Sequence, residues 1–303
     1  MADRIIHLFV FLMVPPLLFG IINKTKAIMA GRKGAPVLQP YHDLFRLFRK
    51  GMVVSTTTTW AFFAGPAVTL SAVMLAGLLI PLGHSPALIS FAGDFILFAY
   101  LFGLARFFTT VAAMDTGSAF EGMGSARELT FAALTEPGLF FAFLVFIKFS
   151  GSMSLTKMLQ PIGYSRFTEG NLAPLVMVVL GLAIILLAEN SRIPVDDPNT
   201  HLELTMIHEV MVLDHSGPLF GIIQYASSVK LFILGSFLCD IIMPSLTGIG
   251  WIDWCVFCFC LFLLAIAIGV VESVMARMRM SRVPVLLIAS FLLCGSALIL
   301  FVR

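Results

Sequence analysis

The titratable side chains of this sequence gather in one segment, residues 188–215, which reads AENSRIPVDDPNTHLELTMIHEVMVLDH. The segment holds six of the 17 acidic residues of the chain and three of its six histidines. Carboxylates and imidazoles whose pKa values are shifted toward neutrality can store and pass protons, and the same groups can bind cations. The segment therefore predicts proton or ion chemistry beside the uncharged run 171–188.

Metal ligation is the other chemistry that such residues suggest, and their spacing argues against it. Three histidines recur every seven residues: His201, His208 and His215. On a helix this spacing separates the ligands by about 10.5 Å, whereas zinc sites favour histidines on one turn. Three of the five cysteines lie in an apolar run, where they pack as small apolar groups: Cys255, Cys258 and Cys260. We therefore expect this chain to bind no metal and no cofactor of its own.

Ionisable residues also fall inside apolar runs, where a bilayer makes each one cost about 2.5–3.5 kcal/mol at mid-helix. They are Arg106, Glu128, Glu136, Lys148, Glu189, Lys230 and Glu272. A chain retains such groups when they pair, face a bundle interior or line a wet path. Glu128 and Glu136 differ by about 80° around a helix and by about 12 Å in depth, which suits two successive stations on one path.

Static ion pairs are the structural alternative to a path. The candidate pairs are Glu136 with Arg106 or Lys230, and Glu128 with Arg127 or Arg192. Static ion pairs would explain why any two of these seven residues are present, but they explain the presence of all seven less easily. A path for protons and a path for a substrate ion need much the same residue types, so these alternatives stay open.

Part of the segment 188–215 has a simpler role to fill. The stretch Thr200-His-Leu-Glu203 matches a capping box that opens a helix after Pro198, so Glu203 caps that helix, lies on the acidic path, or does both. Local chemistry adds four residues to the candidate path: His208, Glu209, Asp214 and Lys230.

The elements that position these residues follow from composition. A mean hydropathy of +1.00, with 59% hydrophobic and 12% charged residues, excludes an ordinary soluble domain, in which about 25% of residues are charged. We predict an all-α, polytopic integral membrane protein, a single domain over residues 1–303 with about eight transmembrane helices. The expected spans lie near 4–23, 60–82, 91–114, 126–149, 172–190, 217–240, 252–273 and 283–302. The lipid bilayer is its expected surroundings, and nothing indicates a nucleic-acid partner.

The loops between these spans carry unequal shares of Lys and Arg. The loop after the first span carries Lys24, Lys26, Arg32, Lys33, Arg46, Arg49 and Lys50, and the loop after the seventh carries Arg277, Arg279 and Arg282. Because basic loops stay on the cytoplasmic side, both termini are expected outside the cell's inner (cytoplasmic) membrane, and 188–215 inside. In the first loop, the stretch PYHDLFRLFRKG places apolar residues on one side of a helix and charged residues around the other. This pattern predicts a short amphipathic helix in the headgroup region of the bilayer.

Four motifs, in order, resemble one family. They are GRKGAPVLQPYHDLFRLFRKG (31–51), DTGSAFEGMGSARE (115–128), AENSRIPVDD (188–197) and ESVMARMRM (272–280). Together they resemble the complex I subunit 1 (NuoH-like) family, which includes membrane subunits of energy-converting NiFe hydrogenases, formate hydrogenlyases and hydrogenase-4-like complexes. The resemblance covers essentially the whole chain.

The resemblance implies a non-redox membrane subunit of an oxidoreductase complex, with no catalytic centre of its own. It would anchor peripheral iron–sulfur and hydrogenase-like subunits, which carry the iron–sulfur clusters and, in the hydrogenase branch, a NiFe centre, and would contact antiporter-like membrane subunits. The candidate proton-transfer residues are Glu128, Glu136, Glu189, Asp196, Glu203, His208, Glu209 and Lys230. The candidate docking and cytoplasmic charge residues are Arg32, Lys33, Asp43, Arg46, Arg49, Arg127, Arg192, Glu272, Arg277 and Arg279.

One departure from the family separates its branches. Quinone-reducing members usually continue the third motif with an acid-rich segment, whereas this chain reads DPNTHLEL, with Asn199 and His201 where carboxylates are usual. This favours the hydrogenase branch, coupling redox chemistry to proton or sodium translocation. The alternatives are a quinone-site subunit of a NADH:quinone oxidoreductase, a stand-alone ion transporter and a purely structural anchor.

Overall fold

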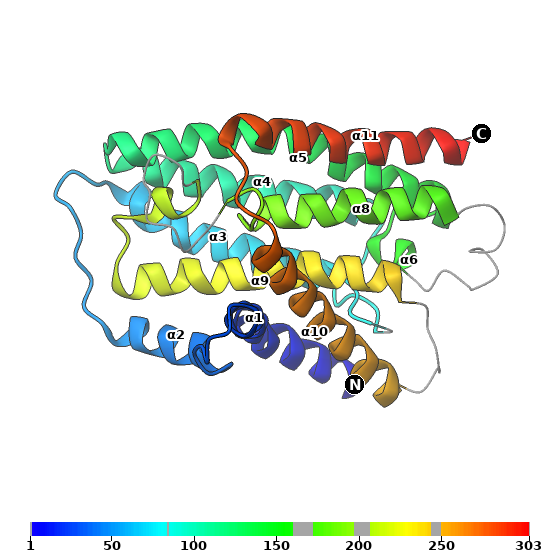
Figure 1. Cartoon of the computed structure of the whole chain (residues 1–303), viewed down its shortest axis with the longest axis horizontal. Coiled ribbons are helices and arrows are strands. Elements are labelled where there is room, and N and C mark those ends of the chain that lie inside the picture. Colours follow the sequence, from blue (N-terminus) through cyan, green and yellow to red (C-terminus); the bar gives the residue numbers. More distant parts are fainter. Residues whose placement is uncertain (1, 84, 160–171, 197–206, 244–249, 303) are drawn as a thin grey trace.

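The computed structural model describes residues 2–83, 85–159, 172–196, 207–243 and 250–302. Throughout these ranges the regular elements are helices, and the one β-type contact is an isolated bridge between Leu82 and Ser85 (Figure 1). The predicted all-α class is therefore confirmed. Residues 200–203, for which a helix cap was predicted, lie outside the described ranges.

Eight helices in the described ranges are long and apolar enough to cross a membrane. They are α1 (Ala2–Met29), α3 (Trp60–Leu79), α4 (Asp94–Asp115), α5 (Ala119–Ser150), α8 (Leu172–Glu189), α9 (Gly217–Ile242), α10 (Gly250–Val274) and α11 (Val283–Val302). The predicted spans agree with them within a few residues, except that α1 runs on past residue 23 and α5 begins before residue 126. Both extensions carry charged residues, which a search for apolar runs excludes.

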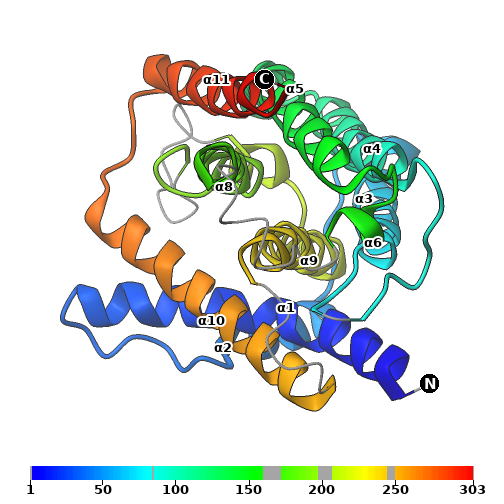
Figure 2. The same cartoon turned by 90° about the vertical axis from the view of Figure 1, so that its right-hand side faces the viewer.

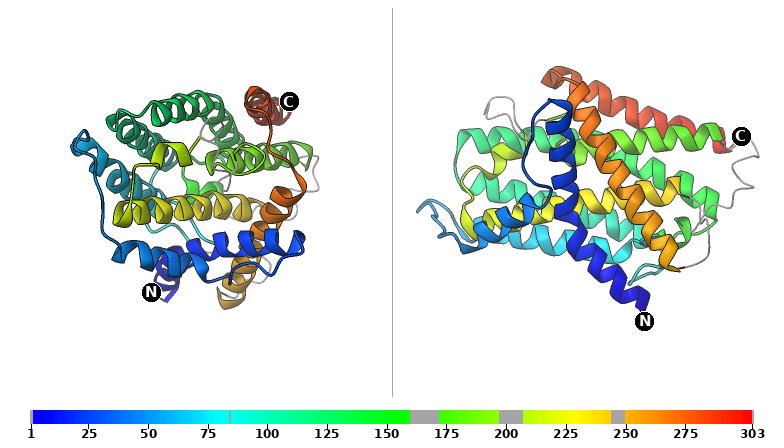
Figure 3. Two further views of the ribbon diagram at one scale, coloured as in Figure 1. Left: turned by 60° about the vertical axis from the view of Figure 1, so that its left-hand side comes forward. Right: turned by 60° about the horizontal axis from the view of Figure 1, so that its bottom comes forward.

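The helices pack around α9, which is the most buried of the eight. In Figure 2, α8 and α9 lie between an upper group of α5 and α11 and a lower group of α1 and α10. The two views of Figure 3 show α1 and α10 side by side. Helices α3 and α4 approach closely at Gly65, where a Cβ atom would lie 2.5 Å from the Cβ of Ala112.

The loop after α1 contains the predicted amphipathic helix, α2 (Gln39–Arg49), which begins with a proline in its first turn and packs on α9 and α1. Leu44 is buried, but Phe45 is 57% exposed, and the guanidinium of Arg49 lies 4.0 Å from the centre of its ring. The apolar side of α2 is thus covered only in part by the rest of the chain.

The segments 30–59, 116–118, 190–196, 207–216 and 275–279 lie at one end of the bundle, which we call the basic end. There the carboxylate of Asp115 accepts hydrogen bonds from the backbone N–H groups of Thr59 (2.6 Å) and Phe62 (3.2 Å). This contact caps the start of α3 with the last residue of α4. The short helix η1 (Glu209–Val212) and the turn η2 (Met280–Arg282) also lie toward this end, whereas α6 (Leu155–Met158) lies at the other.

Candidate functional site

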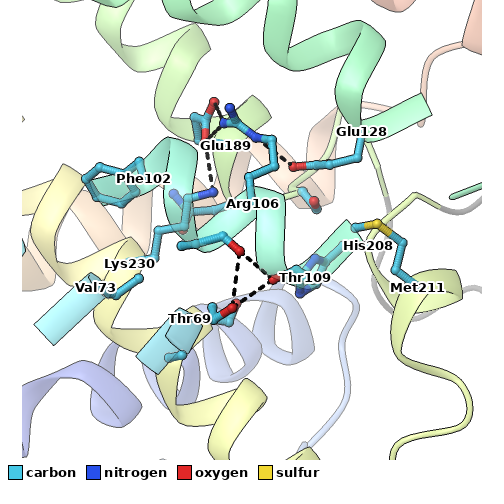
Figure 4. Close-up of a pocket in the computed structure, with 15 residues that line it drawn as sticks. Thr69, Val73, Phe102, Arg106, Thr109, Glu128, Glu189, His208, Met211 and Lys230 are labelled. Carbon is cyan, nitrogen blue, oxygen red and sulfur yellow. Dashed lines mark hydrogen bonds and ion pairs between the residues drawn. The ribbon is translucent and has the colours of Figure 1, made fainter. Parts of the chain in front are cut away.

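Arg106 of α4 is the centre of a buried charge cluster formed by four helices. Its side chain is only 8% exposed. Its Nη2 donates to both carboxylate oxygens of Glu189 at 2.6 and 2.8 Å, and its Nη1 donates to Glu136. Its Nε lies 3.4 Å from Oε1 of Glu128. We call these four residues, together with Lys230, the first cluster, and Figure 4 labels all of its members except Glu136.

Glu189, the last residue of α8, contacts both cations of the first cluster. In addition to its bonds with Arg106, Glu189 accepts a hydrogen bond from the Thr135 hydroxyl at 3.0 Å. It also forms an ion pair with Nζ of Lys230 at 2.8 Å. Three carboxylates face two cations here. The first cluster therefore has one negative charge in excess when all of its groups are ionised.

The sequence predicted Glu128 and Glu136 as separate stations on a path, whereas both carboxylates contact one guanidinium. The long side chain of Arg106 spans the two turns of α5 that separate them. Of the two partners proposed from the sequence for Glu136, the structure shows Arg106. The other, Lys230, pairs with Glu189 instead. Glu128 pairs with Arg106, which was not among the partners expected for it.

The turn that ends α8 directs neighbouring charges to opposite sides. Ser191 has a left-handed backbone (φ 49°), and the N–H of Arg192 bonds the carbonyl of Leu187 at 2.8 Å, as in a helix C-terminal Schellman turn. Glu189 consequently joins the first cluster, and Arg192, three residues later, joins another one.

Among the described residues, this second cluster contains three cations and two carboxylates: Lys26, Arg192, Asp196, Glu272 and Arg277. Glu272 pairs with Lys26 at 2.8 Å and with Arg192 at 3.3 Å, and Asp196 pairs with Arg277 at 2.9 Å. The Arg192 guanidinium also lies 4.4 Å from the centre of the Phe19 ring. Asp196 further accepts the backbone N–H of Ile207 at 2.9 Å, so the second cluster fixes the chain where η1 approaches.

Three of the cavities in the described part of the chain that adjoin the two clusters are large enough to hold a water molecule. The inner cavity, of about 60 Å³, is lined by Arg106, Glu128, Glu189, Lys230 and His208, among others. The basic-end cavity, of about 230 Å³, is lined by Arg192, Asp196, His208 and Glu209. The lateral cavity, of about 270 Å³, lies between α4 and α5 and is lined by Tyr100, Arg106 and Glu136.

The segment that carries His208 and Glu209 is held by contacts at the basic end. The buried carboxylate of Glu121 accepts the backbone N–H of Asp214 at 3.1 Å and a hydrogen bond from Thr116. The next residue, His215, stacks on the ring of Phe62 with centroids 4.0 Å apart. These contacts place η1 against α5 and α4.

The candidate docking residues fall into exposed and buried groups. Arg32, Lys33, Arg46, Arg49 and Arg279 are exposed at the basic end. Asp43 bonds Gln39 at 3.0 Å and lies 3.5 Å from Arg46, and Arg127 contacts the sulfur of Met123. Arg192 and Glu272 are buried in the second cluster, and Arg277 is bound to Asp196 there, so these three hold the chain together.

Three further candidate residues belong neither to the two clusters nor to the docking residues. Glu203 is outside the described ranges. Lys148 is exposed in the last turn of α5, where a lysine can extend toward the interface. Asp214 offers its backbone N–H to Glu121.

Sequence reasoning assigned no role in the path to three of the residues that organise the site. Arg106 was noted as a charge inside a span, and its position in a long apolar run was the available signal. Lys26 was counted as a loop residue, because the extension of α1 to Met29 was not foreseen. Glu121 belonged to a motif without an assigned contact.

Comparison with known sequences gives one consistent family. The family model described as NADH dehydrogenase matches residues 3–303. Formate hydrogenlyase subunit 4 of Escherichia coli (strain K12) is 27% identical over 98% of this chain and 96% of its own length. Hydrogenase-4 component C of the same organism is 29% identical over 78% of this chain and 73% of its own length. A NADH-quinone oxidoreductase subunit of Polaromonas naphthalenivorans is 25% identical over 71% of this chain and 64% of its own length.

Comparison with solved structures supports the fold. A chain of the membrane-bound sulfane sulfur reductase, described as an archaeal respiratory membrane complex, superposes with a TM-score of 0.84. The match covers 99% of this chain and 100% of the other at 20% sequence identity. The family resemblance inferred from the four motifs is confirmed by these matches.

The His215 contact predicts a pH dependence of stability. Burial lowers the pKa of His215 below its ordinary value of 6.5, outweighing the opposite effects of the Phe62 carbonyl and Asp214. A group with a lowered native pKa stabilises the fold above its unfolded pKa, and this contribution is lost as the pH falls below about 6.5. We therefore expect His215→Phe to flatten the fall in thermal midpoint of the detergent-solubilised protein between pH 8 and pH 5.

The matched control is His42→Gln, because His42 is exposed on α2 and should leave the pH profile unchanged. Equal pH profiles for His215→Phe and the unaltered chain would rule out this role for the buried imidazole.

Proposed function

The chain belongs to the NADH dehydrogenase family, and we propose that it is the membrane subunit of a hydrogenase-type complex that couples redox chemistry to ion translocation. In this role it carries a buried charge relay and holds peripheral subunits at the membrane. The electron carriers, iron–sulfur clusters and a NiFe centre, belong to those partners. The observation that carries the proposal is the first cluster, in which one guanidinium binds three carboxylates from two helices.

Coverage of the relatives favours the hydrogenase branch. Formate hydrogenlyase subunit 4 matches along nearly the full length of both chains, whereas the NADH-quinone oxidoreductase relative matches over 64% of its own length. The departure at DPNTHLEL agrees with this preference. A quinone-site subunit is the second candidate, since the basic-end cavity of about 230 Å³ is lined both by the aromatic ring of Phe19 and by charged side chains.

The charge balance of the first cluster suits the storage of a proton. With one carboxylate in excess, the cluster can bind a proton and become neutral while every cation keeps a partner. An extra positive charge at a balanced cluster would instead leave a buried charge uncompensated, which is costly. We assign the stored proton to Glu136, since its side chain is 48% exposed, against 17% for Glu128 and 9% for Glu189.

The position of Glu136 also supports a membrane partner. The residue lies midway along α5 and opens into the lateral cavity beside the exposed Tyr100. A half-exposed carboxylate facing hydrocarbon is costly, so another membrane subunit, of the antiporter-like kind, is expected to cover this face and receive the ion.

The basic end is the proposed site for the peripheral iron–sulfur and hydrogenase-like subunits. Its exposed charges are Arg32, Lys33, Arg46, Arg49 and Arg279. By the distribution of Lys and Arg, this end faces the cytoplasm and both termini face outward from the inner membrane. Basic side chains there would meet acidic surfaces of the partners, which favours rapid association and correct orientation.

The proposed assembly can be tested by purification of the chain from its native membrane in mild detergent, followed by metal analysis. We expect iron–sulfur subunits and nickel to accompany it. Iron without nickel, together with quinone-dependent turnover, would favour the second candidate. Recovery of the chain alone as an active ion transporter would contradict both.

The relay can be tested with Glu136→Gln in the purified complex, reconstituted in vesicles. Glutamine keeps the size and one acceptor oxygen toward Arg106 but cannot bind the stored proton. We expect assembly and electron transfer to be retained and ion movement per electron to be lost, measured with a pH-sensitive dye or a sodium tracer.

Asp3→Asn is the matched control, because it removes an exposed carboxylate in the first turn of α1, far from the first cluster. It should leave coupling unchanged. Normal coupling in Glu136→Gln would reduce its contact with Arg106 to a static ion pair.

A further inference from the structure

The inner cavity and the basic-end cavity share a wall. Four residues line both of them: Asn190, Ser191, His208 and Ser227. His208 is the one ionisable side chain of these four. Among the described residues, His208 is therefore the group of this wall that can take up a proton on one side and release one on the other.

The backbone of His208 is fixed by a hydrogen bond, whereas its ring faces the two cavities. It directly precedes η1, and its carbonyl accepts the N–H of Met211 at 3.1 Å. The ring makes no hydrogen bond or ion pair with any described residue. Figure 4 shows His208 on the same pocket as Thr109, Glu128 and Lys230.

The charged groups that line the two cavities differ in their capacity to accept a proton. Those of the inner cavity are Arg106, Glu128, Glu189 and Lys230, and those of the basic-end cavity are Arg192, Asp196 and Glu209. Glu189 is saturated by Arg106, Thr135 and Lys230. Among the described residues, Glu128 has one polar side-chain contact, at 3.4 Å, with Nε of Arg106. Glu128 is therefore the carboxylate of the inner cavity with lone pairs available to a proton.

We propose that His208 passes protons from the basic-end cavity to Glu128 and thus feeds the first cluster. The proposal rests on the function proposed above. Both cavities exceed the roughly 10–15 Å³ that one water requires, so water can complete the hydrogen-bonded chain on either side of the ring. A protonated Glu209 or a bound water breaks its O–H bond and gives the proton to one ring nitrogen. The carboxylate or hydroxide left behind takes up a proton from solvent through the basic-end cavity.

The resulting imidazolium then loses the proton of its other nitrogen to the Glu128 carboxylate, directly or through water. The ring becomes neutral again with its proton on the opposite nitrogen, and a ring flip or tautomer exchange restores the starting state. One positive charge moves from cavity to cavity, and no electron is transferred. Imidazole suits this step because each of its two ring nitrogens can bind a proton or release one.

The route discriminates against sodium. An imidazole relays a proton but not a metal ion, and Arg106 and Lys230 place two positive charges on the inner cavity. Protons should therefore move through this wall whether or not sodium is present. The simpler explanation is that His208 only fills space between η1 and α4, in which case a neutral side chain of similar size would replace it.

The test compares His208→Gln and His208→Ala in the purified, vesicle-reconstituted complex, with His42→Gln as the matched control on the exposed face of α2. Proton movement per electron is followed with a pH-sensitive dye in sodium-free buffer. We expect both His208 variants to lower it by about tenfold or more, with electron transfer retained. Added imidazole should restore it in His208→Ala, because the free base can occupy the vacated volume.

Unchanged coupling in His208→Gln overturns the inference. Loss of coupling that imidazole fails to restore, or a loss of assembly in both variants, assigns His208 a structural role and also overturns it. The Glu136→Gln variant separates this failure from that of the proposed function. If Glu136→Gln uncouples the complex and the His208 variants do not, the relay stands and its feed through His208 is wrong.

Discussion

Arg106 places a permanent positive charge inside the membrane-spanning bundle, where a guanidinium without partners would be strongly destabilising. Its three carboxylate partners come from α5 and α8, and Lys230 of α9 completes the balance at Glu189. The rotation and depth of α4, α5 and α8 are thereby tied to one side chain, and α9 is tied to it through Glu189. Aliphatic packing would hold the same helices together but would tolerate small shifts, whereas directional bonds to a planar guanidinium tolerate few.

The turn that ends α8 separates two clusters of different charge. The left-handed turn at Ser191 places Glu189 in the first cluster, with one negative charge in excess, and Arg192 in the second cluster, whose described members are three cations and two carboxylates. These counts hold when all groups are ionised. The two clusters lie on either side of the wall that contains His208. A proton crossing that wall moves toward the excess negative charge of the first cluster, which favours its inward movement.

Much of the fold could be predicted from the sequence, because apolar runs of about 20 residues have few alternatives to a spanning helix. The pairings within the site could not be predicted, because a single sequence does not say which helices are neighbours. Glu128 and Glu136 were expected at separate depths, and the reach of Arg106 brings both to one group. Lys26 pairs with Glu272 only because α1 continues to Met29, beyond its apolar run.

A double-mutant cycle at Arg106 and Glu189 tests the central claim most directly. Arg106→Gln leaves three carboxylates with only Lys230, so it should sharply lower the thermal stability of the purified chain. Adding Glu189→Gln should recover part of that loss, with a coupling free energy of at least about 1 kcal/mol. Additive effects of the two substitutions would contradict the claim that one shared guanidinium organises the bundle.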